Sequence, residues 1–215
     1  MTENPMTGTL LPLEALNPEG KAQGERVPQS RPLSIPVILG TGRKGRMSAH
    51  AARFVCRELQ KRDGVETELL DIAELMHQLD DNGQGTGDAA FAGSMARADA
   101  IVIVTPEYNH AMPGLLKHVL DSCLKEYIHK AAGIVAVSAG PFGGTRVIET
   151  SLPVLRELGL VTIFWDVNVG SVAKVFDESG KLLDDAFVRR TDKFLSELIW
   201  MAKTLRYGRE NIAIS

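Results

Sequence analysis

One short apolar run, Ala100-Ile101-Val102-Ile103-Val104, constrains the fold of this chain more than any other segment. It is rich in β-branched residues and too short to span a membrane, so it predicts a strand that is buried on both faces. Such strands belong to parallel sheets that helices cover on both sides. The chain leaves this strand through Pro106, which fixes φ and donates no hydrogen bond, and a helix is predicted to begin after Pro113-Gly114.

Predicted strands and helices alternate along the rest of the chain. Apolar runs predict strands at residues 35–39, 67–70, 100–104, 133–137 and 161–165. Helical spacing of apolar residues predicts helices at 48–62, 88–98, 115–125, 145–158 and 184–205, and the polar, glycine-rich stretch 80–88 is predicted to be a loop. Strict alternation implies a parallel sheet with right-handed crossovers. Five strands suit an α/β three-layer sandwich with the flavodoxin-like strand order 2-1-3-4-5.

Two predicted helices carry a clear apolar face. In 48–62 that face consists of Ala52, Val55, Cys56 and Leu59, and in 184–205 it consists of Val188, Leu195, Leu198 and Ala202. Gly159 follows the helix at 145–158 and suits a left-handed cap.

Residues 1–33 hold five of the ten prolines and show no sustained periodicity, which predicts an extended or disordered arm. Residues 34–215 are expected to form one domain. The chain is 44% hydrophobic and 24% charged, an ordinary soluble composition. Its net charge of -3 gives no indication of nucleic-acid or acidic-membrane binding.

The sequence shows no membrane span, no secretory signal and no pattern of metal ligands. Cys56 and Cys123 form no CxxC pair. We expect both to be core or interface thiols in a reducing compartment, and therefore a cytoplasmic protein.

The segment from Gly40 to Ser48 predicts an anion site, because it lies between a strand and the start of a helix. A helix start offers free N–H groups and the positive end of the helix dipole. Arg43 and Lys44 add positive charge, while Thr41 and Ser48 add hydroxyl donors.

The same loop matches G-x-G-x-x-G at Gly40, Gly42 and Gly45, the fingerprint of dinucleotide-binding folds. Asp71 lies near the place of the acid that such folds use for ribose, so a Rossmann-type dehydrogenase stays open as an alternative. Two cations within the turn favour a terminal phosphate over a pyrophosphate.

Two further loops follow the predicted strands at 100–104 and 133–137. The first, from Thr105 to Lys117, places an acid, an aromatic residue and an amide in a row at Glu107-Tyr108-Asn109. The second, from Ser138 to Gly144, is rich in glycine. Ligands of open α/β sheets lie beyond the carboxyl ends of the strands, so the three loops are expected to surround one site.

The stretch 106–117 resembles the PEYN-x-x-x-PG-x-LK signature of the NADPH-dependent FMN reductases, and the resemblance extends over roughly residues 34–205. The loop at 40–48 resembles that family's GS-x-R-x-GS phosphate loop. Thr41 takes the Ser position and Arg43 matches the Arg, whereas Arg46 and Ser48 replace a second Ser and an Asn of many members. The loop at 138–144 resembles the family's S-x-G-x-x-GG turn.

The resemblance implies that the protein binds FMN and uses NADPH or NADH. The cofactor-binding residues that it implies are Thr41, Arg43, Lys44, Gly45, Arg46, Met47, Ser48, Pro106, Glu107, Tyr108, Asn109, Ser138, Gly140, Gly143 and Gly144. Glu107 is expected to hold the loop or a subunit contact rather than to act as an acid or base.

It further implies that hydride passes to FMN and on to a quinone, a flavin or a similar small acceptor by a ping-pong mechanism. No catalytic side chain is needed. Subunits are expected to pair as a homodimer or homotetramer through the apolar helix after Pro113-Gly114. A flavodoxin-like electron carrier and a flavin-binding regulator remain as alternatives.

Overall fold

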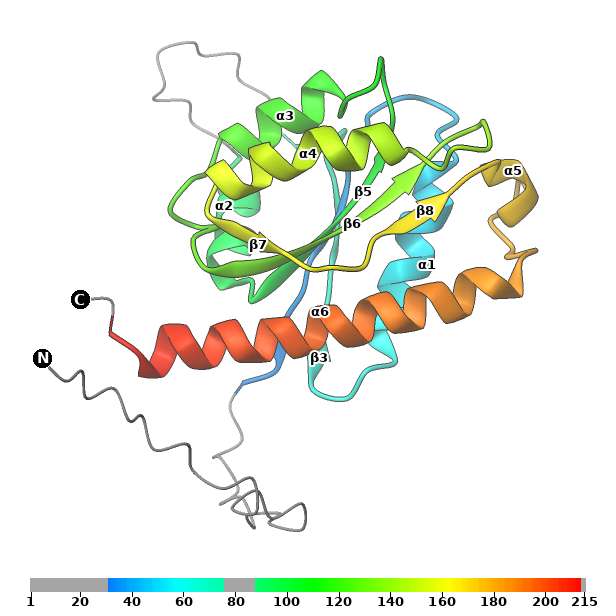
Figure 1. Cartoon of the computed structure of the whole chain (residues 1–215). Coiled ribbons are helices and arrows are strands. Elements are labelled where there is room, and N and C mark those ends of the chain that lie inside the picture. The colour runs from blue at the N-terminus through cyan, green and yellow to red at the C-terminus, as the bar shows by residue number, and fades with distance from the viewer. Residues whose placement is uncertain (1–30, 76–87, 214–215) are drawn as a thin grey trace, which may run out of the picture. The chain divides into compact units, whose positions relative to one another are not determined.

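The computed structural model describes residues 31–75 and 88–213 (Figure 1). The predicted arm at 1–33 and the predicted loop at 80–88 lie almost wholly outside these ranges.

The sheet is parallel throughout. Its strands are β2 (Val37–Leu39), β4 (Leu69–Asp71), β5 (Ala100–Pro106), β6 (Lys130–Val137), β7 (Leu160–Thr162) and β8 (Val167–Val169). Their order is β4-β2-β5-β6-β7, and β8 pairs with the other end of β6. A separate parallel pair, β1 (Leu33–Ser34) with β3 (Val65–Glu66), precedes β2 and β4. Because β7 and β8 are successive pieces of one strand position, the order is 2-1-3-4-5 and the predicted fold is confirmed.

Helices cover both faces of this sheet (Figure 1). One face is covered by α1 (Ser48–Gln60) and α6 (Asp185–Asn211), and the other by α2 (Ala89–Arg97), α3 (Gly114–Asp121) and α4 (Thr145–Glu157). A short helix, α5 (Val172–Val175), lies between β8 and α6. The layers form the expected three-layer sandwich.

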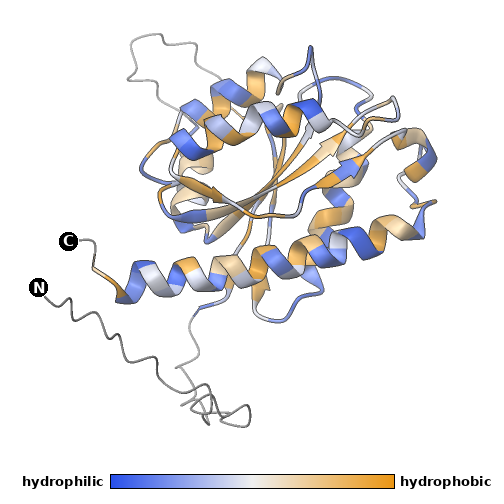
Figure 2. Cartoon of the chain, in the orientation of Figure 1, coloured by the Kyte–Doolittle hydropathy of each residue, from blue (hydrophilic) through white to orange (hydrophobic). Residues whose placement is uncertain are grey.

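The run that opens β5 is buried on both faces, as predicted, and Figure 2 shows β5 and β6 as largely hydrophobic strands. Val102 and Val104 pack on the side of α1 and α6, while Ile101 and Ile103 pack on the side of α2, α3 and α4. In the neighbouring β6, a Cβ atom at Gly133 would stand 2.5 Å from the ring of Phe194. This glycine therefore lets α6 approach the sheet closely.

The last strand differs from its prediction at 161–165. It breaks after Thr162 and resumes at Val167. Phe164 in the gap is 79% exposed, and its ring meets that of Trp165 edge-on at 4.8 Å. Lys193 Nζ lies 3.3 Å from the centre of the Trp165 ring. The apolar run was thus misinterpreted as continuous strand because its aromatic end turns away from the core.

Two helix ends are stabilised by the capping residues at those positions. The Asp88 carboxylate accepts hydrogen bonds from the N–H groups of Ala90 and Phe91, which caps α2. Gly159 has a φ of 80°, as its predicted left-handed cap requires.

The predicted face of α1 is buried. On α6 the prediction of Val188 is wrong: Val188 is exposed, and Phe187 takes the core position one residue earlier.

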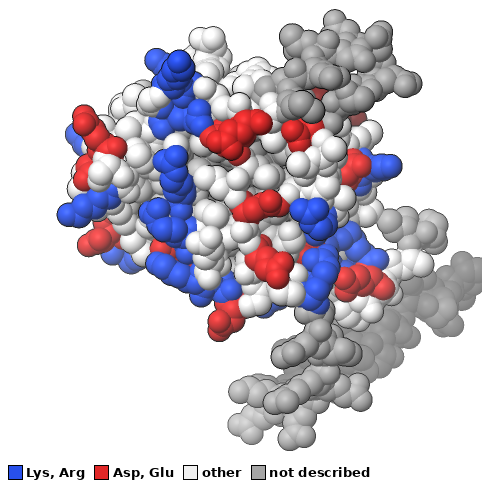
Figure 3. Space-filling view, turned by 180° about the vertical axis from the view of Figure 1, so that it is seen from behind, with Lys and Arg blue, Asp and Glu red and all other residues white. Residues whose placement is uncertain are grey.

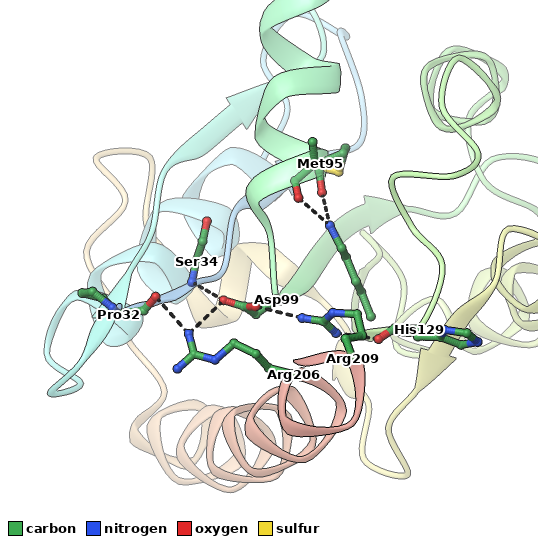
Figure 4. A network of polar contacts seen from close by, with 9 residues as sticks. Pro32, Ser34, Met95, Asp99, His129, Arg206 and Arg209 are labelled. Carbon is green, nitrogen blue, oxygen red and sulfur yellow. Dashed lines mark hydrogen bonds and ion pairs between the residues drawn. The ribbon is translucent and has the colours of Figure 1, made fainter. Parts of the chain in front are cut away.

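A polar network ties the last turns of α6 to the amino ends of the central strands (Figure 4). Asp99, which is fully buried, accepts hydrogen bonds from the Ser34 N–H at 3.1 Å, from Arg206 at 3.4 Å and from Arg209 at 2.8 Å. Arg209 also donates to the His129 carbonyl at 2.6 Å. This end of the sheet is opposite to the one from which the three predicted loops leave.

Both cysteines are unpaired and buried, and burial raises the pKa of each thiol. Within the described ranges no helix has the length and apolarity to cross a membrane. The same part of the chain holds no group of three or more His, Cys, Asp or Glu side chains arranged for a metal ion.

Candidate functional site

The three polar loops meet at the carboxyl ends of β2, β5 and β6. Together they line a cavity of about 530 Å³, here called the central cavity. Its lining includes thirteen of the fifteen predicted site residues, namely Thr41, Arg43, Lys44, Gly45, Arg46, Met47, Ser48, Pro106, Glu107, Tyr108, Ser138, Gly140 and Gly144. Asn109 and Gly143 lie outside this lining.

The first loop leaves two buried polar side-chain atoms without a partner beside the central cavity. Ser48, the first residue of α1, is buried, and its Oγ has no partner. The Nε of Arg46 is likewise buried without a partner. The first N–H groups of a helix have no acceptor within it, and the helix dipole is positive there. Leaving buried polar groups unpaired costs free energy, so this end of the cavity is built for an anion.

In a dinucleotide-binding fold the Asp71 carboxylate would have to be free to bind the ribose, but here it already has partners. Its carboxylate pairs with Arg46 and accepts a hydrogen bond from the Ala73 N–H at 3.0 Å. The strand order also differs from the 3-2-1-4-5-6 order of classical dinucleotide-binding folds. Both observations favour a phosphate loop over a dinucleotide loop.

The second loop closes on itself and is joined to the first loop by a hydrogen bond. Tyr108 and Ala111 exchange backbone hydrogen bonds of 2.9 and 3.0 Å, and Asn109 and His110 between them have left-handed φ values of 50° and 69°. This tight turn directs Asn109 into a neighbouring cavity of about 640 Å³, which Pro113, Gly114 and Leu115 also line. The Tyr108 hydroxyl shares a 2.9 Å hydrogen bond with Thr41 Oγ1, which joins the second loop to the first.

Glu107 holds the second loop against α4. Its Oε2 accepts a 3.2 Å hydrogen bond from the Arg146 N–H, and its Oε1 lies 3.5 Å from the Arg146 guanidinium. Among the described residues that line the central cavity, Glu107 is the only carboxylate. Because Glu107 is already paired, the described lining of this cavity offers no free carboxylate.

The third loop packs on β8 and the start of α5. The Ser138 N–H donates to the Val169 carbonyl at 2.9 Å, and the Gly140 carbonyl accepts from the Ser171 N–H at 2.7 Å. Gly143 has a φ of 62°, and a Cβ atom there would stand 2.7 Å from the Asn168 side chain, so Gly143 serves packing on β8. At Gly140 a Cβ atom would meet no atom within 4 Å, because this residue borders the open cavity.

Five lining residues were not predicted: Val137, Ala139, Phe142, Arg146 and Val172. Phe142 is 71% exposed, and the Arg146 guanidinium lies 5.7 Å from the centre of its ring. Phe142 could have been predicted as a lining residue because it is an aromatic residue within a glycine-rich turn. Val172 belongs to α5, which is too short to be recognised from its pattern.

Comparisons with known proteins agree with this architecture. The family model described as NADPH-dependent FMN reductase matches residues 33–174. A quinone reductase from Pseudomonas putida is 30% identical over 184 residues, which cover 78% of this chain and 95% of that protein. An NADPH azoreductase from a Bacillus species is 32% identical over 123 residues, covering 55% of this chain and 66% of the other.

Among solved structures, the flavoenzyme NAD(P)H:(acceptor) oxidoreductase FerB from Paracoccus denitrificans aligns with a TM-score of 0.66 at 21% identity, covering 80% of this chain and 98% of that one. At this identity the likeness establishes the fold alone. The family match covers the strands and loops that build the central cavity. The chain therefore belongs to the NADPH-dependent FMN reductase family.

Proposed function

We propose that this protein oxidises NAD(P)H and passes the electrons through FMN, bound in the central cavity, to a quinone or a similar small acceptor. The observation that carries the proposal is the meeting of three loops around one cavity with unpaired donors at one end. Relatives named quinone reductase, NAD(P)H-dependent FMN reductase and azoreductase support the reaction class.

The residues of the cavity fit FMN. The unpaired Ser48 Oγ and Arg46 Nε, with Arg43, Lys44 and the start of α1, would hold the phosphate. Backbone at 106–108 and the uncrowded Gly140 line the same cavity and would contact the flat ring. When bound, FMN supplies the hydride chemistry that the protein's own side chains lack.

The protein's own contribution is to position the reacting compounds and to shield them from water. The Tyr108–Thr41 hydrogen bond and the Glu107–Arg146 pair keep the second loop rigid beside the cavity. A rigid wall lowers the entropy cost of orienting a nicotinamide and later an acceptor. We expect the nicotinamide and the acceptor to use the same open side of the bound flavin in turn.

Steady-state kinetics test the proposed reaction. Initial rates against NADPH at several quinone concentrations should give parallel double-reciprocal lines, because one open side cannot hold both compounds. Intersecting lines with a trapped ternary complex would contradict the shared side. FMN absorbance that neither NADH nor NADPH bleaches would instead indicate the electron carrier or the flavin-binding regulator.

Arg43→Ala should weaken FMN binding about tenfold or more, because a charge-assisted hydrogen bond contributes roughly 1.5–3 kcal/mol. Riboflavin, which lacks the phosphate, should bind the variant and the parent protein almost equally. Fluorescence titration of both flavins measures the difference. An equal loss for the two flavins would remove Arg43 from the phosphate site.

We also propose a homodimer, or a homotetramer built from such dimers, but the structure changes the basis for it. Leu116, Val119, Leu120 and Cys123, which were expected to join subunits, are buried within the subunit's own core. The surface beside them retains Leu124, 59% exposed, and Ile128, 43% exposed. A second subunit there would cover apolar surface near α3, whose first residues line the cavity that holds Asn109.

Sedimentation velocity at micromolar concentration should therefore show a species of at least twice the 23.4 kDa chain mass. Leu124→Asp should shift that species toward the monomer, because a charge within an apolar contact is costly to desolvate. A monomer for the unaltered protein would exclude the proposed assembly.

A further inference from the structure

A second cavity lies against the first loop and is lined by an excess of positive charge. It has a volume of about 340 Å³ and is here called the basic cavity. The charged or titratable residues of its lining are Arg43, Lys44, Arg46, His50, Arg53 and Glu178. Figure 3 shows a band of Lys and Arg side chains on the side of the molecule that carries α1.

Three of these cations have no acidic partner among the residues that the structure describes. Arg46 pairs with Asp71, whereas Arg43, Lys44 and Arg53 form no ion pair with any carboxylate that the structure describes. Glu178 is the only acid among the described residues of this lining. Converging cations that the fold leaves unneutralised repel one another and favour a bound anion.

The geometry of α1 strengthens the site. His50 and Arg53 are three residues apart on this helix, so they lie on one face, and both belong to its first two turns. The positive end of the helix dipole adds to their attraction for an anion.

The basic and central cavities share a wall. Arg43, Lys44, Gly45, Arg46 and Met47 line both of them. When the nicotinamide of a nucleotide enters the open side of the central cavity, its adenosine end lies outside that cavity. The adenosine end can then extend across the shared loop to the basic cavity. NADPH differs from NADH only by a phosphate on the adenosine ribose.

We infer that the basic cavity binds the 2′-phosphate of NADPH, with His50 and Arg53 as its ligands, and thereby makes the protein prefer NADPH to NADH. This inference rests on the proposed function. Arg43, Lys44 and Arg46, which line both cavities, would lie between the FMN phosphate and the 2′-phosphate and screen their repulsion.

Paired substitutions test the preference. Arg53→Met should lower kcat/KM for NADPH about tenfold and leave kcat/KM for NADH nearly unchanged, because only NADPH carries the charge that Arg53 would bind. Glu178→Gln should act in the opposite direction and raise kcat/KM for NADPH. Arg57→Met, the same change on an exposed arginine of α1 outside the cavity, is the matched control.

A binding measurement gives a readout independent of turnover. In calorimetry with the FMN-loaded protein, adenosine 2′,5′-bisphosphate should bind at least tenfold more tightly than adenosine 5′-monophosphate, and Arg53→Met should abolish the difference. Inorganic phosphate should compete only weakly. Equal binding of the two nucleotides, or an Arg53→Met loss that is equal for NADPH and NADH, would overturn the inference.

The remaining outcomes separate two failures. If inorganic phosphate competes as strongly as the bisphosphate, the cavity is a free-anion site and the inference fails. If neither nicotinamide bleaches FMN, the proposed function fails, and the inference, which rests on it, fails with it even where the bisphosphate binds. If both nicotinamides bleach FMN but the substitutions leave the NADPH-to-NADH ratio unchanged, only the inference fails.

Discussion

Asp99→Ala is expected to lower the free energy of unfolding by about 3–5 kcal/mol, the usual cost of removing one partner from a buried ion pair. The Asp99 carboxylate is fully buried and offsets the charge of two guanidinium groups, Arg206 and Arg209 (Figure 4). Without it both arginines keep their positive charge beside the core. Urea unfolding followed by circular dichroism measures the loss.

Asp121→Ala is the matched control for this change. Asp121 pairs with Lys117 on the surface of α3, where both side chains are nearly half exposed. An exposed pair contributes about 0–1 kcal/mol. If the two alanine variants lose stability equally, the Asp99 network does not hold α6 to the sheet. Asp99→Asn, which keeps the size of the side chain, separates the loss of charge from the loss of volume.

The sheet could be predicted because its signals are local. A short β-branched run such as that of β5 has few alternatives to a buried strand, and alternation with helices then restricts the topology. Errors arose where tertiary contacts decide. Phe164 turns outward to meet Trp165, which ends the strand early. On α6, Phe187 and Val188 are both apolar, but Phe187 faces the core and Val188 is exposed. Helical spacing alone does not separate two adjacent apolar residues.

The loops that line the central cavity could be predicted from the sequence, whereas the positions of individual side chains were harder to predict. Thirteen predicted residues line the central cavity because three strand ends place their loops at one edge. Asn109 lies elsewhere because a left-handed turn directs it into the next cavity. Arg146 was missed because it enters from α4 through its pair with Glu107, a contact between residues 39 positions apart.

Gly140→Leu is expected to weaken FMN binding by one to two orders of magnitude while leaving the fold intact. Overfilling a packed site costs typically 1–3 kcal/mol, and each 1.4 kcal/mol is a tenfold change in affinity. A Cβ atom at Gly140 meets no protein atom within 4 Å, and the φ of this residue lies outside the left-handed region. The leucine side chain would therefore occupy cavity volume that the flat ring needs.

Gly143→Leu is the contrasting variant, three residues further along the same loop. There the φ of 62° and the Asn168 side chain 2.7 Å away oppose any Cβ atom, so the thermal unfolding midpoint should fall. Gly140→Leu should keep the parental midpoint without added FMN and lose most of the stabilisation that FMN gives the parent protein. A Gly140→Leu protein that binds FMN as tightly as the parent would place the flavin outside the central cavity.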